Sequence, residues 1–171
     1  MAGPRPAPPW RTWWRRPARS AQSCRPTTAD VSSSGSEAQA SDPDDVVREV
    51  VAELGARVEA VVAAGIAPDR LVVDPGLGFA KRAEHDLSLV AGLAEVCALG
   101  RPVLVAGSRK RFLGHVLADA DGAPPPAHGR DAATAALSAI AAYQGAWAVR
   151  VHDVRATADA VRVAHAIGTA G

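Results

Sequence analysis

Polar and charged residues follow three short apolar stretches of the sequence, at the point where each stretch ends. The stretches are Leu71–Val73, Val103–Ala106 and Trp147–Val151. The residues that follow or end them are one carboxylate, one hydroxyl, three cations and one imidazole: Asp74, Ser108, Arg109, Lys110, Arg150 and His152. Carboxylates accept the N–H groups of heterocycles, and cationic side chains bind anions. This mixture suits a substrate that has both a hydrogen-bonding heterocycle and an anionic group.

Each of these groups also has a purely structural interpretation. Asp74 precedes Pro-Gly, and in the structural interpretation it does no more than form a turn. The run "SRKR" can be the solvated start of a helix, and the pair His152-Asp153 can be a surface histidine followed by a helix cap. Their placement at the same end of three consecutive strands favours a shared site over three coincidences.

The apolar stretches are expected to be strands of a parallel sheet, because they are short and apolar on both faces. Helical patterns separate them, at about 43–64, 84–97, 130–144 and 157–167, and the run "GSRKRFLG" after the second stretch is expected to open a further helix. The predicted order αβαβααβα is typical of an α/β fold with right-handed crossovers. In such folds the carboxyl ends of the strands form the ligand site, which would bring the groups above together.

Composition narrows the classes of function. The net charge of +1 gives no reason to expect nucleic acid or a membrane surface as a partner, and no run of 18 apolar residues predicts a membrane span. Two cysteines, Cys24 and Cys97, indicate neither a disulfide framework nor a metal site, so a cytoplasmic location is expected. Of the 19 basic residues, only Lys81 and Lys110 are lysine, and both fall in the candidate loops.

Residues 1–41 differ from the rest of the chain. Residues 1–29 hold six Arg, six Pro and three Trp with no acidic residue, and "SSSGSEAQASDP" follows shortly after. No hydrophobic period is present, so this segment is expected to be disordered or non-native and to carry no secondary structure. Order is predicted to begin at Asp42, as a helix N-cap, with Pro43 at the first helical position.

The motifs "VVDPGLGFAKRAEHD", "PVLVAGSRKRFLG" and "AVRVHDV" resemble the three C-terminal signatures of dihydropteroate synthase, in that family's order. The resemblance covers about residues 42–167. It implies a (β/α)8 TIM barrel that joins dihydropterin pyrophosphate to p-aminobenzoate in folate synthesis. Sulfonamides compete with p-aminobenzoate in that family, and its members form homodimers.

The resemblance also implies a role for each matching residue. Asp74 would hold the amino-pyrimidine edge of the pterin, and Lys110 would contact the pterin carbonyl and ring nitrogen. The p-aminobenzoate pocket would be bordered by Phe79, Ser108 and Arg109. The pyrophosphate would be bound, and stabilised as it leaves, by Arg150 and His152 with assistance from Mg²⁺. In the family, C–O cleavage runs ahead of amine attack, so stabilisation of the leaving anion supplies most of the catalysis.

The resemblance accounts for a partial barrel only, about the last three βα units, with residues 42–171 as the C-terminal part of a pterin-binding domain. The family's magnesium ligand lies in the N-terminal half, so no metal-binding residue is assigned in this chain. The composition of residues 1–41 suggests a shifted reading frame or a wrong start. Two alternatives remain: a catalytically inactive remnant that pairs with an intact copy, and a folate-binding methyltransferase domain, which also presents a pterin-holding Asp.

Overall fold

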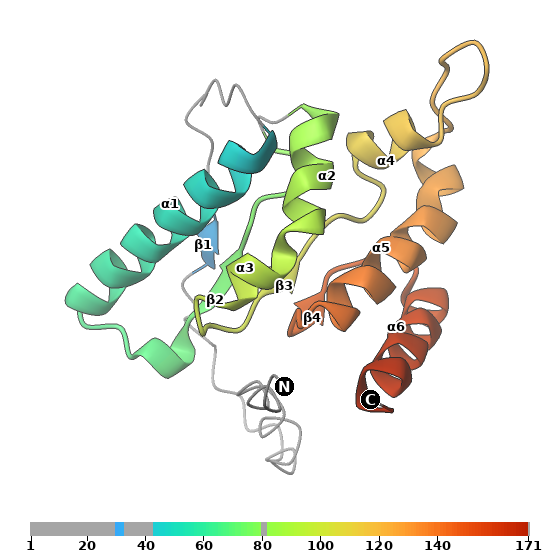
Figure 1. Cartoon of the computed structure of the whole chain (residues 1–171). Coiled ribbons are helices and arrows are strands. Elements are labelled where there is room, and N and C mark those ends of the chain that lie inside the picture. Colours follow the sequence, from blue (N-terminus) through green and yellow to red (C-terminus); the bar gives the residue numbers. More distant parts are fainter. Residues whose placement is uncertain (1–29, 33–42, 80–81, 171) are drawn as a thin grey trace, which may run out of the picture.

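A computed structural model describes residues 30–32, 43–79 and 82–170 of the chain. These residues form four strands, which lie through the middle of the structure in Figure 1. The strands are β1 (Asp30–Ser32), β2 (Val72–Asp74), β3 (Leu104–Val105) and β4 (Ala148–Val149). β1 pairs with β2 and β3 with β4, and a parallel bridge between Val73 and Val103 joins the two pairs. The strands therefore lie in chain order, with all four carboxyl ends at one edge.

Strand β1 corrects the prediction that residues 1–41 carry no secondary structure. Asp30 pairs with Val72 and Ser32 with Asp74, so a parallel strand does precede the first helix. With a single apolar residue in three, this strand has no pattern of its own, and its pairing with β2 defines it. The rest of the segment, the predicted cap Asp42 and the loop residue Lys81 lie outside the described residues.

The described residues also form six α-helices: α1 (Pro43–Ala63), α2 (Ala83–Ala91), α3 (Leu93–Cys97), α4 (Arg111–Val116), α5 (Asp131–Tyr143) and α6 (Val154–Thr169). Two 3₁₀ turns, η2 (Pro68–Arg70) and η3 (Ala127–Arg130), complete the described elements. In Figure 1, α1 lies at one side, α2 and α3 in the middle, and α5 with α6 at the other side. Pro43 begins α1, as predicted.

Two helix boundaries differ from the sequence-based expectation. The predicted single helix over 84–97 is broken at Gly92, where a Cβ atom would come within 2.8 Å of Val47 Cγ1. A glycine there lets α1 pack closely against the junction of α2 and α3. The last helix begins at Val154 rather than Thr157, because Asp153 Oδ1 accepts the backbone N–H groups of Arg155 and Ala156, at 3.1 and 3.4 Å.

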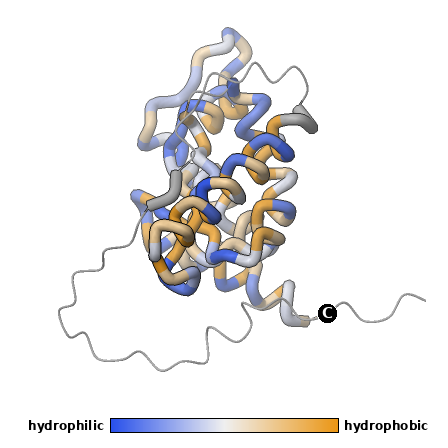
Figure 2. Tube along the Cα trace, turned by 90° about the vertical axis from the view of Figure 1, so that its left-hand side faces the viewer, coloured by the Kyte–Doolittle hydropathy of each residue, from blue (hydrophilic) through white to orange (hydrophobic). Residues whose placement is uncertain are grey.

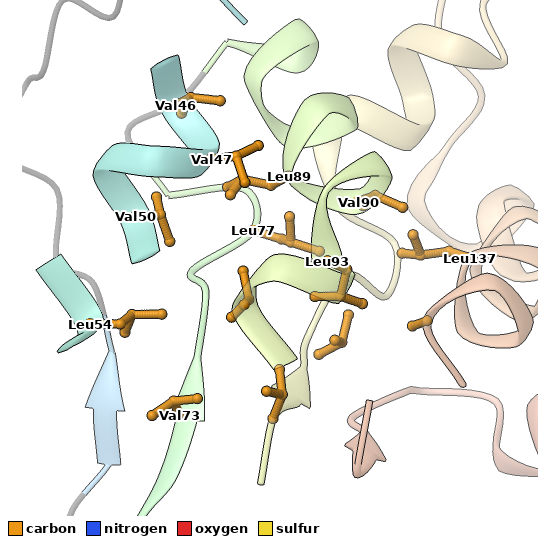
Figure 3. Packing of buried hydrophobic residues seen from close by; sticks show 14 of the residues in the cluster. Val46, Val47, Val50, Leu54, Val73, Leu77, Leu89, Val90, Leu93 and Leu137 are labelled. Atoms are coloured by element: carbon orange, nitrogen blue, oxygen red, sulfur yellow. The ribbon is translucent and has the colours of Figure 1, made fainter. Parts of the chain in front are cut away.

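The core lies between α1, the strands and α2, and extends to α5 (Figure 3). Leu54, Val73 and Leu89 are fully buried, and Leu137 brings α5 into the same cluster. Along the helices in Figure 2, hydrophobic and hydrophilic residues alternate, which is the pattern of amphipathic helices. Among the described helices, none combines the length and the apolar content that a membrane crossing requires.

Candidate active site at the carboxyl ends of the strands

Asp74 ends β2 as a buried carboxylate, with 5% of its surface exposed. Its Oδ1 accepts the backbone N–H of Gly76 at 2.9 Å, which forms the tight turn that the Asp-Pro-Gly sequence predicts. Gly76 has a φ of 73°, a conformation that suits glycine. The turn-forming role of Asp74 is therefore present in the structure. Asp74 also lies at the carboxyl end of a strand, where a carboxylate that binds a ligand is expected.

A second buried carboxylate, Asp86 of α2, fixes the glycine loop that connects Asp74 to α2. Asp86 is 2% exposed, and its Oδ1 accepts the backbone N–H of Gly78 at 2.8 Å. From the sequence, Asp86 has no predicted role. The contact depends on how α2 packs back on its preceding loop, so no local pattern could have revealed it.

Lys110 and Phe79 approach each other from two different loops. The Nζ atom of Lys110 lies 3.9 Å from the centroid of the Phe79 ring, within the range of a cation–π contact. Gly78 makes this approach possible, since a Cβ atom at that position would lie 2.7 Å from Lys110 Cδ. Phe79 remains 52% exposed, so much of its ring is free to contact a ligand.

Ser108 and His152 join the ends of β3 and β4. Ser108 Oγ lies 2.9 Å from His152 Nδ1 and accepts the backbone N–H of His152 at 3.2 Å. Ser108 is nearly buried, whereas His152 is exposed. A hydroxyl that accepts this N–H can donate its own hydrogen to Nδ1, and Nε2 then carries the ring hydrogen. The imidazole can in this way present a hydrogen-bond donor at the edge of the sheet.

Arg109 makes an ion pair that the sequence did not suggest. Its guanidinium makes two hydrogen bonds to Asp131 at the start of α5, from Nε at 2.7 Å and from the terminal nitrogen at 2.8 Å. The pair raises the pKa of Arg109, and the Arg109 hydrogen bond lowers the pKa of Asp131. Arg109 therefore enters the site as part of an ion pair with its neighbour α5.

Arg150 follows β4 and is exposed, and its backbone N–H donates to Val105 O at 3.0 Å. A groove of about 770 Å³ opens beside the loop of Gly78. It is lined by both charged and apolar residues from the start of α2, from α4 and from the loop before α5, among them Arg82, Asp86, Arg111, Phe112, His115 and Arg130. The groove provides room for a small molecule next to the loop that carries Phe79.

The described residues contain no group of three or more His, Cys, Asp or Glu side chains that could hold a metal ion. The carboxylates of this edge each already accept a hydrogen bond: Asp74 from Gly76 N, Asp86 from Gly78 N and Asp131 from Arg109. Mg²⁺ prefers an octahedral set of oxygen ligands, often carboxylates and waters. The residues of this edge therefore do not fit a protein-built magnesium site.

The structure thus brings the predicted residues together in two direct contacts, Lys110 with Phe79 and Ser108 with His152. It pairs Arg109 with a residue that the sequence did not suggest. Three residues that contact Arg109 were missed: Arg130, Asp131 and Thr134, all close to the start of α5. They lie more than twenty positions away in the sequence, beyond the reach of motif spacing.

Comparison with known proteins gives a consistent result. The profile of the pterin binding enzyme family matches residues 21–152. A dihydropteroate synthase from Mycobacterium leprae is 58% identical over 119 residues, which cover 70% of this chain and 42% of that protein. One from Neisseria meningitidis serogroup C is 45% identical over 125 residues, 72% of this chain and 42% of that protein. The chain therefore spans less than half the length of these relatives.

Solved structures show the same likeness. A dihydropteroate synthase from Coxiella burnetii in complex with pteroic acid aligns with a TM-score of 0.72 and 31% identity, over 78% of this chain and 47% of that one. One from Yersinia pestis in a sulfonamide drug complex gives 0.69 and 35%, over 79% and 47%. The resemblance inferred from the three motifs is confirmed. This chain belongs to the pterin binding enzyme family.

Proposed function

We propose that this chain supplies the C-terminal part of a cytoplasmic dihydropteroate synthase, which condenses dihydropterin pyrophosphate with p-aminobenzoate and releases pyrophosphate. The observation that carries the proposal is the grouping, at one edge of the sheet, of Asp74 with the contacts Lys110–Phe79 and Ser108–His152. The relatives are dihydropteroate synthases, and the motifs that hold these residues resemble that family's signatures.

The pterin would be held by Asp74 and Lys110. A buried carboxylate at the end of β2 can accept two parallel N–H bonds from an amino-pyrimidine edge. A compact ammonium suits the opposite side of the ring system, where a carbonyl oxygen and a ring nitrogen accept hydrogen bonds. The contact of Lys110 Nζ with the Phe79 ring supports this role, because it holds the ammonium beside the glycine loop.

The pyrophosphate would be bound by Arg150 and His152. In the reaction, the C–O bond between the pterin methylene carbon and the diphosphate breaks, and its electron pair stays on the leaving oxygen. The amine nitrogen of p-aminobenzoate then bonds to that carbon and loses a proton. Cationic and N–H groups that face the departing anion stabilise the transition state most, and a donor at His152 Nε2 fits this task.

The p-aminobenzoate ring would lie against the exposed face of Phe79, with the neighbouring groove as its route to the site. The guanidinium of Arg109 is paired with Asp131, so Arg109 is not proposed as the group that binds the carboxylate of p-aminobenzoate. Magnesium would arrive with the pyrophosphate of the substrate. The described residues offer no oxygen cluster for it, and no step is assigned to the ion.

The architecture would be part of a (β/α)8 barrel. Four parallel strands in chain order, each followed by a helix, support this proposal. Residues 42–171 would form the C-terminal part of the pterin-binding domain, with β1 as one further strand before them. A homodimer, as in the family, is part of the proposal.

The test is a pair of measurements on the 171-residue chain. Calorimetric titration with an unphosphorylated pterin and with pyrophosphate measures binding, and a coupled assay for released pyrophosphate measures turnover. Binding together with turnover is expected. Binding without turnover would identify the chain as an inactive member of the family. A folded chain that binds neither ligand would overturn the proposed site.

A further inference from the structure

Arg109 has an unusual backbone conformation. Its φ is 58°, and it is the one non-glycine residue with a positive φ in the part of the chain that the structure describes. Side chains with a Cβ atom adopt this left-handed conformation at a cost, and it persists where surrounding contacts hold it in place. The contacts that hold Arg109 are therefore of interest, since the next residue is Lys110.

The backbone N–H, the carbonyl oxygen and the guanidinium of Arg109 are all bound by one short segment of the chain. Its backbone N–H donates to Thr134 Oγ1 at 3.1 Å, and its carbonyl oxygen accepts from the terminal nitrogen NH1 of Arg130 at 3.0 Å. Its guanidinium makes the two hydrogen bonds to Asp131 described above. The three partners belong to the segment 130–134, where η3 leads into α5.

This segment is itself well fixed. Thr134 is 1% exposed, and its hydroxyl donates to Arg130 O at 2.9 Å, so the same oxygen atom both donates and accepts. The guanidinium of Arg130 also donates twice to Pro125 O, at 3.0 and 2.8 Å. It lies so close to Gly114 that a Cβ atom there would come within 2.7 Å of its central carbon. The partners of Arg109 are thus held from both sides.

We infer that Arg130, Asp131 and Thr134 are positioning residues, which hold Arg109 in its left-handed conformation and thereby direct the Lys110 side chain across the Phe79 ring. The backbone N–H of Lys110 donates to Gly107 O at 3.3 Å, and the guanidinium of Arg130 donates to Lys110 O at 3.4 Å. Peptide planes on both sides of Arg109 are therefore fixed. The direction in which Lys110 leaves the backbone follows from them.

The inference rests on the proposed function only for the role of Lys110 toward the pterin, and the geometry can be tested without a ligand. The chain has only two lysines, so selective ¹³C,¹⁵N-lysine labelling gives two sets of side-chain resonances. Those of Lys110 are identified by their loss in Lys110→Arg. They carry a ring-current shift from Phe79, which Phe79→Leu removes.

Thr134→Val removes the hydroxyl at nearly constant volume, and Thr134→Ser keeps it. Thr134→Val is expected to move the Lys110 resonances toward their positions in Phe79→Leu, whereas Thr134→Ser keeps them near the wild-type positions. Unchanged Lys110 resonances in a folded Thr134→Val chain would overturn the inference. The inference would also be overturned if Phe79→Leu, as the single substitution, left the Lys110 resonances at their wild-type positions.

Thr134 is buried, so Thr134→Val can fail to fold, which circular dichroism would show. Asp131→Asn, at a partly exposed side chain, then provides the second test. It is expected to move the Lys110 resonances while helix content stays constant, and unmoved resonances would contradict the inference. Addition of a pterin separates the two proposals. If the variants move the Lys110 signals and the pterin does not, the positioning role stands and the proposed function fails.

Discussion

The hydroxyl of Ser108 and the imidazole of His152 lie 2.9 Å apart, although 44 positions separate the two residues in the sequence. The same hydroxyl accepts the backbone N–H of His152. Ser108 therefore holds both the main chain and the ring of the histidine that is proposed to bind pyrophosphate. The family resemblance implies that Ser108 borders the p-aminobenzoate pocket. The two roles predict a loss of affinity for different ligands when Ser108 is substituted.

Ser108→Ala is expected to weaken pyrophosphate binding about two- to tenfold, as the loss of one net hydrogen bond of roughly 0.5–1.5 kcal/mol implies. Calorimetry with pyrophosphate measures this. In a His152→Ala background the same substitution should have little further effect, because the serine acts through the ring. A loss confined to sulfonamide binding would instead place Ser108 in the p-aminobenzoate pocket.

Arg150→Ala and Asp74→Asn should separate the anion from the heterocycle. Arg150→Ala is expected to weaken pyrophosphate about tenfold, roughly 1.4 kcal/mol, and to leave an unphosphorylated pterin nearly unaffected. Asp74→Asn should do the reverse. Titration of both ligands against both variants gives the answer, with Arg162→Ala, an exposed arginine of α6, as the matched control for a lost cation. Equal losses for both ligands in Arg150→Ala would contradict this division of the site.

Gly78→Ala should disturb the contact between Phe79 and Lys110. The new Cβ would lie 2.7 Å from Lys110 Cδ at a φ of 74°, so the variant combines a clash with roughly 1–2 kcal/mol of backbone strain. Gly100→Ala is the matched control, because it has a φ of 71° and open space around the added atom. Both variants should lower thermal stability, and only Gly78→Ala should weaken pterin binding. Similar pterin affinity in the two would remove Gly78 from the site.

Cys97 should react slowly with alkylating reagents. Burial raises the pKa of its thiol from 9.0 to about 11, so at neutral pH its thiolate fraction is about a hundredfold lower than that of an ordinary thiol. In a Cys24→Ser chain, the rate at which iodoacetamide alkylates Cys97 can be measured for the folded protein and for the protein unfolded in urea. The folded state binds this proton more tightly than the unfolded state, so the contribution to stability is present below pH 9 and is lost as pH rises toward 11. Equal rates in both states would show that the thiol is accessible.

The sequence predicted the main elements and the edge of the sheet at which the polar groups meet. It could do so because short apolar strands and the residues at their ends form local patterns, as around Asp74 and Lys110. Interactions between distant segments were not predictable. The break of the helix at Gly92 depends on the packing of Val47, and the pairing of Arg109 with Asp131 depends on the approach of α5.

Strand β1 illustrates a third reason. Its sequence, Asp-Val-Ser, has no strand pattern, and its conformation comes from a neighbour forty positions later. The sequence around β1 is rich in Arg, Pro and Ser, a composition that predicts no regular structure. Local propensity was overridden here by pairing, the usual limit of single-sequence interpretation of short strands.

The arrangement of the strands in chain order has a consequence for the kinetics of folding. Each of β2, β3 and β4 pairs with the strand that precedes it in the sequence, so no pairing has to wait for a segment synthesised much later. Loop closure is limited to one helical crossover at a time, which keeps the entropic barrier of each step modest even though parallel pairing is slow. From β2 onward, the sheet can therefore grow as the polypeptide leaves the ribosome, and each completed strand becomes the template for the next.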